Sequence, residues 1–203
     1  IPLAATSATR AKVIAAKKIM METIKNDPVF NGGNYTKEDI EKFGSSGLSV
    51  ARMLGFLDYL SPDTMEKKFN RKYVDTDGLF ELFGRFEVER YLEYNGYNFP
   101  NWFDPLSYLY LLKAISIFDI SFGFESLGDA LKNIKNRVYP IGFSGDLMFR
   151  SSELEEIKTV MDSIGKGEQC RFFEIESDYG HDAFLVELDK FSNIISDILE
   201  DKI

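Results

Sequence analysis

Short apolar runs in this chain alternate with longer segments in which apolar side chains recur at helical spacing. Runs of the first kind are typical of buried strands, and segments of the second kind are typical of amphipathic helices. Strand followed by helix, repeated along a chain, favours an α/β fold with a parallel sheet. The strand-like runs are residues 1–6, 137–143 and 171–175, and the helix-like segments beside them are 8–24, 152–164 and 185–198.

The middle of the chain is helical in pattern. Thr36 with Asp39 resembles a capping box at the start of a helical region that extends to about Leu60. Asp104 before Pro105 predicts another helix start, because aspartate caps the first turn and proline needs no donor there. Further segments are predicted as a helix over 86–94, a turn over 95–101, a short helix over 127–134 and a capping box at Ser152 and Glu155. We therefore predict core residues 1–20, a helical lid insertion at 21–130 and a carboxyl-terminal core at 131–203.

Composition excludes several classes of function. The formal net charge is −9 and no basic stripe is present, which argues against nucleic acid as a partner. No apolar run reaches the roughly 18 residues of a membrane span, so we expect no membrane association. Cys170, the only cysteine, has apolar neighbours and is predicted to be a core residue in a reducing compartment such as the cytoplasm.

The chain opens without methionine, at Ile1, inside a strand-like run. We expect it to be the later part of a longer chain.

The candidate chemistry lies after two of the predicted strands. His181, the only histidine, follows the run 171–175, and Asp146 follows the run 137–143. The carboxyl ends of neighbouring parallel strands carry the active site in open α/β sheets. An Asp146–His181 hydrogen bond is therefore expected, in which the acid fixes the tautomer of a histidine that exchanges protons near neutral pH.

Aspartate followed by histidine is the order in which α/β-hydrolases supply the last two members of a catalytic triad. The preceding member, a serine in a Gly-x-Ser-x-Gly elbow, occurs nowhere in the sequence. Gly44-Ser45-Ser46-Gly47 and Gly142-Phe143-Ser144-Gly145 have the wrong spacing and resemble turns. The nucleophile is expected to lie upstream of this chain.

Several stretches together resemble the carboxyl-terminal part of the homoserine O-acetyltransferases, acyltransferases of methionine biosynthesis with the α/β-hydrolase fold. The matching stretches are 1–10, 26–28 with 31–35, 47–55 with 59–61, 68–71, 88–94, 103–104 with 107–109, and 179–185.

The resemblance implies that Asp146 and His181 are the catalytic acid and base, and that Arg52 and Asp182 bind the amino-acid substrate. A guanidinium suits the substrate carboxylate, and Asp182 suits its ammonium group. The implied co-substrate is acetyl-CoA and the acceptor is homoserine, with no bound cofactor or metal and with a homodimer formed through the lid.

The chain departs from the usual family pattern at several positions, which bear on the choice of acyl donor and acceptor. Gly145 stands where serine is usual, Arg150-Ser151 where proline is frequent, Trp102 where arginine is usual and Leu106 where asparagine is usual.

Three alternatives remain open: a hydrolase on the same fold, a succinyltransferase or relative with another acceptor, and a non-catalytic subunit. For the isolated chain we expect no activity, because the serine is missing, and poor solubility, because its sheet would expose an edge.

Overall fold

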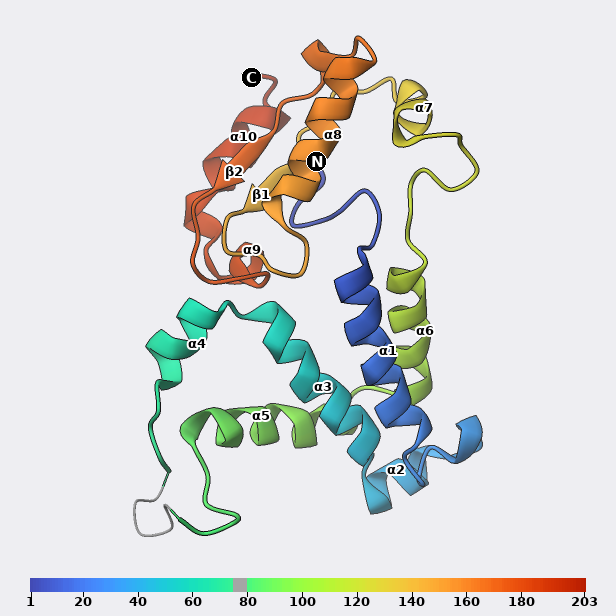
Figure 1. The fold of residues 1–203 in the computed structure, drawn as a ribbon, viewed down its shortest axis with the longest axis vertical. Coiled ribbons are helices and arrows are strands. Elements are labelled where there is room, and N and C mark those ends of the chain that lie inside the picture. Colours follow the sequence, from blue (N-terminus) through green and yellow to red (C-terminus); the bar gives the residue numbers. More distant parts are fainter. Residues whose placement is uncertain (75–79) are drawn as a thin grey trace. The chain divides into compact units, whose positions relative to one another are not determined.

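The computed structural model describes residues 1–74 and 80–203. It contains α1 (Ala11–Lys25), α2 (Lys37–Phe43), α3 (Ser46–Tyr59), α4 (Pro62–Phe69), α5 (Glu87–Asn98), α6 (Pro105–Ser116), α7 (Leu127–Lys132), β1 (Ile141–Phe143), α8 (Ser151–Ser163), β2 (Phe173–Ile175), α9 (Ala183–Val186) and α10 (Ser192–Leu199), with 3-10 turns at Asn31–Gly33, Phe99–Asn101, Gly167–Gln169 and Leu188–Lys190 (Figure 1).

The chain forms two compact units. The core unit comprises Ile1–Ala8, Asp58–Thr64 and Asp119–Ile203, and the helical unit comprises Thr9–Leu57 and Met65–Phe118. The predicted ranges 1–20, 21–130 and 131–203 concern the layout of the whole protein and stay a prediction.

The centre of the core unit is a parallel pair of strands, as the strand–helix alternation predicts. β1 and β2 run parallel with Ile141 opposite Phe173 and Phe143 opposite Ile175. The strand predicted over 137–143 is shorter than expected, because Pro140 has no N–H for the ladder. Before Pro140, an isolated parallel bridge joins Val138 to Cys170.

The prediction of a full strand at residues 1–6 is wrong. Leu3 forms a parallel bridge with Ile141, and Ala4 N–H donates to the Ile141 carbonyl at 3.0 Å. Ala4 itself has φ +45°, which breaks the extended conformation. The segment is therefore a single bridge at the edge of β1.

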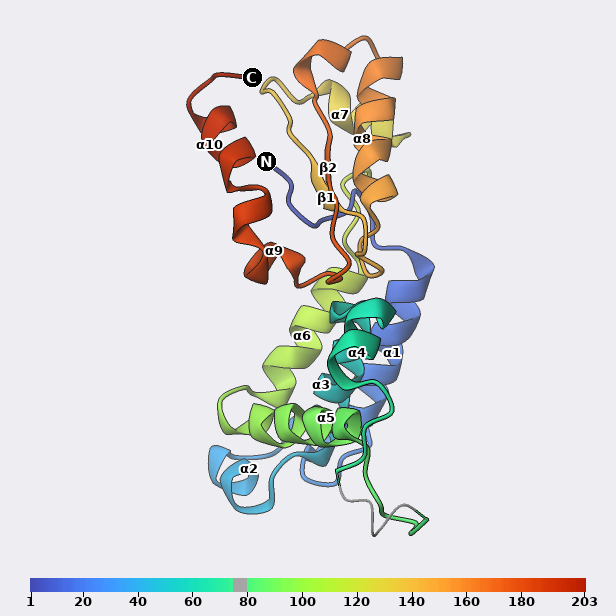
Figure 2. The same ribbon diagram turned by 90° about the vertical axis from the view of Figure 1, so that its left-hand side faces the viewer.

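Helices cover both faces of this small sheet, as Figure 2 shows. On one face α7 and α8 bury Leu131, Leu154 and Met161 beside Cys170, which confirms that the cysteine is a core residue. On the other face α9 and α10 pack against the strands. The apolar side chains buried on that side are Ala4, Ile141, Phe143, Ile175, Ala183 and Phe191.

The helical unit has its own core. Helices α1 and α6 lie side by side (Figure 1), and their apolar faces meet those of α3 and the Phe99 turn. The predicted caps of this unit are present: Thr36 and Asp39 form the capping box of α2, and Asp104 caps α6 by accepting from Ser107 N–H. The buried cluster is Met20, Ile24, Phe30, Leu48, Ala51, Phe99, Tyr108 and Leu112.

Two further local predictions are wrong. The predicted turn at 95–101 is the end of α5 followed by a 3-10 turn. Gly96 lies inside the helix because α3 approaches it closely: a Cβ there would lie 2.6 Å from Met53 Cε. The capping box at Ser152 and Glu155 is absent, because the N-cap of α8 is Arg150, two residues earlier, and the helix begins at Ser151.

The predicted last helix, 185–198, is interrupted. It consists of α9, the 3-10 turn at Leu188–Lys190 and α10. The first part of this segment, α9, follows the histidine directly.

Candidate active site

Asp146 and His181 lie at the same edge of the sheet, each in the loop after its strand. His181 Nδ1 is 2.8 Å from Asp146 Oδ2, so the structure contains the hydrogen bond expected from the sequence. The Asp146 side chain is fully buried and the His181 side chain is 13% exposed. The pair is thus shielded from water on the acid side and reachable on the base side.

The loop of Asp146 fixes the orientation of the carboxylate. Its Oδ1 accepts hydrogen bonds from the N–H groups of Met148 (2.8 Å) and Phe149 (2.9 Å). A carboxylate only accepts hydrogen bonds, so Nδ1 of His181 is the donor in the contact with Oδ2. This tautomer leaves the lone pair of Nε2 available to accept a proton from another group.

Aromatic side chains surround the imidazole. The ring of His181 meets Phe149 at 5.4 Å and Phe184 at 5.5 Å between centroids, both in edge-to-face geometry, and Tyr59 lies at 6.4 Å. These contacts limit rotation of the imidazole. They also keep water from its faces, which strengthens the electrostatic pairing with Asp146.

Asp182, the predicted ligand of the substrate ammonium group, follows His181 and occupies the N-cap position of α9. Its backbone N–H donates to the Tyr59 carbonyl at 3.2 Å. Its side chain makes no capping hydrogen bond to the helix. The structure therefore brings Asp146, His181 and Asp182 together in the core unit.

Arg52, the fourth predicted site residue, belongs to the helical unit, on α3. Its guanidinium carbon lies 4.8 Å from the ring centroid of Phe56 and 4.7 Å from that of Phe99. Such stacking holds the planar guanidinium in one orientation. The role of Arg52 stays a prediction.

A cavity of about 590 Å³ opens in the helical unit. Trp102 and Leu106, two of the departures from the family pattern, both line it. In its wall the Tyr35 hydroxyl lies 2.5 Å from Asp104 Oδ1. Burial and this hydrogen bond raise the pKa of Tyr35 to about 12. Burial alone would raise the pKa of Asp104, but hydrogen bonds from Tyr35 and Ser107 outweigh it and lower that pKa.

Other chemistry is limited in the described part of the chain. Burial raises the pKa of the Cys170 thiol, which disfavours the nucleophilic thiolate. Among residues 1–74 and 80–203, no cluster of three or more histidine, cysteine or acidic side chains could hold a metal ion. In the same ranges, no helix is long and apolar enough to cross a bilayer.

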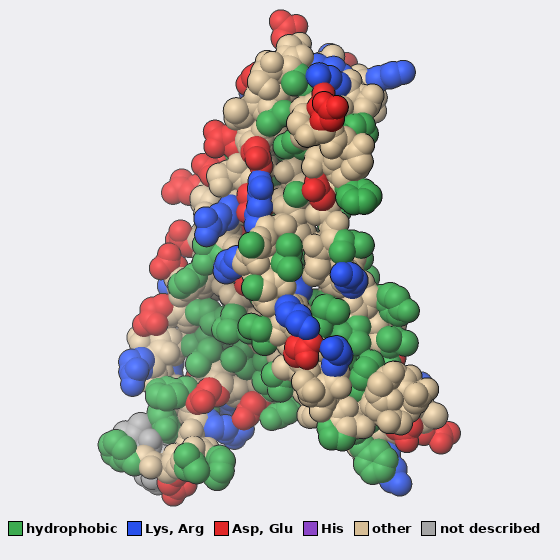
Figure 3. All heavy atoms as spheres, turned by 45° about the vertical axis from the view of Figure 1, so that its right-hand side comes forward, with side chains coloured by type: hydrophobic (Ala, Val, Ile, Leu, Met, Phe, Trp, Pro, Cys, Tyr) green, Lys and Arg blue, Asp and Glu red, His purple; other side chains and the backbone are tan. Residues whose placement is uncertain are grey.

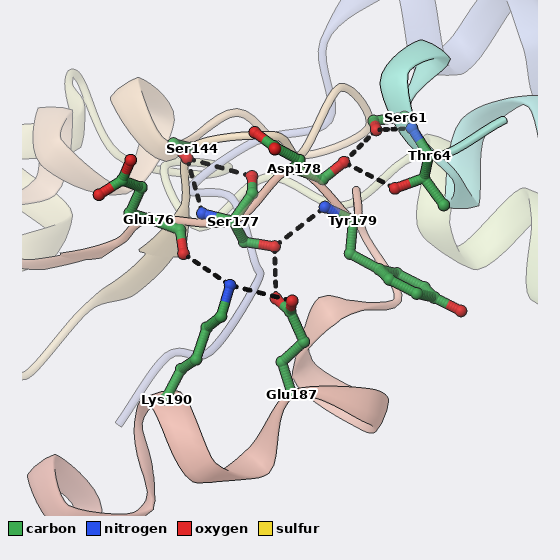
Figure 4. Close-up of polar contacts among 9 residues, drawn as sticks. All are labelled: Ser61, Thr64, Ser144, Glu176, Ser177, Asp178, Tyr179, Glu187 and Lys190. Atoms are coloured by element: carbon green, nitrogen blue, oxygen red, sulfur yellow. Dashed lines mark hydrogen bonds and ion pairs between the residues drawn. The ribbon is translucent and has the colours of Figure 1, made fainter. Parts of the chain in front are cut away.

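Sequence reasoning missed the side chains that hold the histidine loop. Ser144, Ser177 and Glu187 form hydrogen bonds around this loop, as Figure 4 shows. They belong to no motif. The only signal in the sequence is the frequency of serine next to the two strand ends, which is also typical of ordinary turns.

Comparison with known proteins identifies the family of this chain. No protein-family model matches the chain. Curated relatives do: the homoserine O-acetyltransferase of Nautilia profundicola is 57% identical over 100% of this chain and 55% of its own length. That of Sulfurimonas autotrophica is 50% identical over 98% of this chain and 54% of its own length. The chain thus spans about half the length of the curated relatives it matches.

Solved structures agree on the fold. A homoserine O-acetyltransferase from Bacillus anthracis superposes with a TM-score of 0.84 at 23% identity, covering 95% of this chain and 50% of that one. Esterase E22 superposes with a TM-score of 0.80 at 19% identity, covering 95% and 52%. These likenesses confirm the α/β-hydrolase fold. The curated relatives show that this chain belongs to the homoserine O-acetyltransferase family. It corresponds to a carboxyl-terminal part of such a protein.

Proposed function

We propose that the protein to which this chain belongs transfers an acetyl group from acetyl-CoA to the hydroxyl of homoserine through a serine acyl-enzyme. The observation that carries the proposal is the buried Asp146–His181 hydrogen bond in a chain whose curated relatives are named homoserine O-acetyltransferases. The serine is supplied by the part of the protein outside these 203 residues.

The first half of the reaction forms the acyl-enzyme. His181 Nε2 takes the proton of the serine hydroxyl while the serine oxygen bonds to the thioester carbonyl carbon. The carbon–sulfur bond then breaks, and the imidazolium returns the proton to the departing thiolate of coenzyme A. Asp146 stabilises the imidazolium in between, because its carboxylate faces Nδ1 at 2.8 Å.

The second half repeats this proton transfer with homoserine. His181 takes the proton of the homoserine hydroxyl, whose oxygen attacks the acyl-enzyme carbonyl, and the proton then returns to the departing serine oxygen. The acetyl ester of homoserine leaves with the original serine restored. No step requires a bound metal or cofactor.

The acceptor is recognised by its two charged groups in this proposal. Arg52 binds the carboxylate and Asp182 binds the ammonium group. Support comes from the resemblance of the stretches around both residues to the family, from the orientation that stacking gives to Arg52, and from the position of Asp182 next to His181.

We further propose a homodimer formed through the helical unit and a role in methionine biosynthesis in the cytoplasm. Large apolar side chains lie on the surface of this unit, among them Tyr94 (71% exposed), Trp102 (68%) and Tyr110 (71%). The space-filling view shows hydrophobic side chains among charged ones on one face of the molecule (Figure 3). Exposed aromatic side chains are enriched at protein interfaces.

A hydrolase is the second candidate, and the superposition with an esterase supports it. It would use the same Asp146–His181 pair with water as acceptor. Water carries no carboxylate or ammonium group, so the substrate-binding roles proposed for Arg52 and Asp182 argue against this candidate. A succinyltransferase differs only in the donor, and a non-catalytic subunit would lack the serine in the whole protein.

One experiment separates these functions. The full-length protein is incubated with homoserine and either acetyl-CoA or succinyl-CoA, and O-acylhomoserine, free acid and released coenzyme A are quantified by mass spectrometry. We expect O-acetylhomoserine in amounts equal to coenzyme A. His181→Ala should abolish it and Asp182→Asn should raise the KM for homoserine, whereas Asp201→Asn, at a side chain 80% exposed, should change neither.

Free acetate as the main product would identify a hydrolase, and O-succinylhomoserine a succinyltransferase. No turnover with any donor would favour the non-catalytic subunit. The 203-residue chain alone should give no product.

A further inference from the structure

The loops that carry the acid and the base are joined directly to each other. Ser177 N–H donates to Ser144 Oγ at 3.0 Å, and the Ser144 hydroxyl donates back to the Ser177 carbonyl at 3.1 Å (Figure 4). Ser144 lies two residues before Asp146 and Ser177 lies four residues before His181. This reciprocal pair therefore sets the distance between the two loops just beyond the end of the sheet.

The hydroxyl of Ser177 extends this connection to α9. It donates to Glu187 Oε2 at 2.6 Å and accepts from Tyr179 N–H at 3.1 Å. Ser177 is 2% exposed. Removing one of these partners would therefore leave a buried polar group without a hydrogen bond, which costs stability. Glu187 remains charged at neutral pH: burial raises its pKa, but hydrogen bonds from Ser177 and Lys190 lower it by more.

Lys190 completes the attachment on the same side. Its Nζ lies 2.9 Å from Glu187 Oε1 and donates to the Glu176 carbonyl at 3.1 Å. In Figure 4, Glu187 approaches the loop from the end of α9 and Lys190 from the 3-10 turn after it, while Ser144 approaches from the loop of the acid.

A separate attachment is present at Asp178. The Ser61 hydroxyl donates to the Asp178 carbonyl, and the Thr64 hydroxyl donates to the same oxygen at 2.9 Å (Figure 4). The sheet ends before this loop, which these side chains hold together with two backbone hydrogen bonds, from Ser61 N–H to the Tyr179 carbonyl and from Asp182 N–H to the Tyr59 carbonyl.

We propose that Ser177 is a positioning residue for the reaction: with Glu187 as its acceptor and Ser144 as its partner, it holds the loop of His181 at the distance from Asp146 that the hydrogen bond between them requires. This inference rests on the proposed function, because it concerns a reaction that passes through His181. Catalytic groups must be held within about 0.5 Å of their productive geometry, and a misplacement of about 1 Å can reduce the rate about 100-fold.

The test uses the full-length protein and four variants. Ser177→Ala removes the hydroxyl that donates to Glu187 and leaves the backbone contacts of residue 177 with Ser144 in place. Glu187→Ala removes the acceptor, and Glu187→Gln keeps an acceptor oxygen but no charge. The matched control is Ser126→Ala: the Ser126 hydroxyl caps α7 by accepting from Asp129 N–H at 3.1 Å, in the same unit but away from the loop.

The readouts are kcat, KM for both substrates, the single-turnover rate of acyl-enzyme formation and the melting temperature. We expect Ser177→Ala and Glu187→Ala to lower kcat and the acylation rate by about 10- to 100-fold with KM within about two-fold. Glu187→Gln should restore kcat to within about three-fold of wild type, because the amide oxygen still accepts from Ser177. Ser126→Ala should lower the melting temperature and leave kcat unchanged.

Two results would overturn the proposal. One is a kcat of Ser177→Ala and Glu187→Ala within two-fold of wild type. The other is a kcat of Glu187→Gln as low as that of Glu187→Ala, which would assign the effect to charge. If Ser177→Ala does not fold, the two Glu187 variants decide alone. Failure of the proposed function is distinct from both, because wild type itself would then form no O-acetylhomoserine.

Discussion

Replacing Gly180 by alanine tests how closely the histidine loop must approach the turn between α3 and α4. Gly180 precedes His181 and has φ +109°, a backbone conformation that is unfavourable for residues with a Cβ. A Cβ there would lie 2.5 Å from Ser61 N and 2.7 Å from the Tyr59 carbonyl oxygen. Both are backbone atoms, and Ser61 N–H is already bonded to the Tyr179 carbonyl at 3.0 Å. A Cβ at residue 180 would therefore force the histidine loop and the turn apart.

The expected loss of stability has two parts. The positive φ costs about 1–2 kcal/mol for a residue with a Cβ, and crowding against well-packed atoms costs about 1–3 kcal/mol more. Gly180→Ala should thus destabilise the protein by about 2–5 kcal/mol by these estimates. Gly165→Ala isolates the first part, because Gly165 has φ +76° and nothing within 4 Å of its Cβ position. It should cost only about 1–2 kcal/mol.

Urea unfolding of the full-length protein and both variants measures these costs, with the slopes compared to show that the same transition is followed. The kcat of Gly180→Ala should also fall, because a shifted loop moves His181 away from Asp146, while that of Gly165→Ala should not. Equal losses of stability in the two variants would refute the argument, because the close approach of Gly180 to Ser61 and Tyr59 would then carry no energetic weight.

Three further changes have expected outcomes. Asp146→Asn should lower kcat by about 10⁴-fold, the effect of the same change in a serine protease triad, because the amide favours the wrong imidazole tautomer; steady-state kinetics and circular dichroism would separate this loss from unfolding. Gly145→Ser should lower kcat about ten-fold although serine is usual there in the family, since its Cβ would lie 2.4 Å from the Ser177 carbonyl oxygen; kcat equal to wild type would contradict this. The pKa of Tyr35 is raised from 10.0 to about 12, so its contribution to stability is complete below pH 10 and is lost as pH rises from 10 to 12; Tyr35→Phe should remove this part of the pH dependence, measured as melting temperature from pH 8 to 12.

The parts of the fold that local chemistry determines could be predicted from the sequence. The capping box at Thr36 and Asp39 and the cap at Asp104 satisfy backbone groups within one turn, so their residues identify them without tertiary information. The parallel pairing of β1 with β2 follows from the alternation of strand and helix patterns.

Predictions failed where packing between distant segments decides the conformation. Gly96 resembles a turn residue in sequence but is a helical glycine that admits Met53. Ser152 resembles an N-cap, yet α8 begins before it. Ala4 gives no local warning of its positive φ. For Gly96 the deciding atoms belong to Met53, far along the chain. For α8 the N-cap lies two residues before the expected one, a shift that propensity cannot resolve.

In the site, too, one part could be predicted from the sequence and another could not. The register of the sheet pairs Phe143 with Ile175, which brings the acid and base loops to one edge and makes their meeting predictable. The loops differ in length, however, because Asp146 is three residues beyond its strand and His181 is six. A parallel register cannot set the contact distance of side chains on loops of unequal length. The hydrogen bonds of Ser144 and Ser177 can, because they join the loops after the ladder has ended. Strand order therefore identifies the two residues, and side chains that belong to no motif determine whether they are close enough to act together.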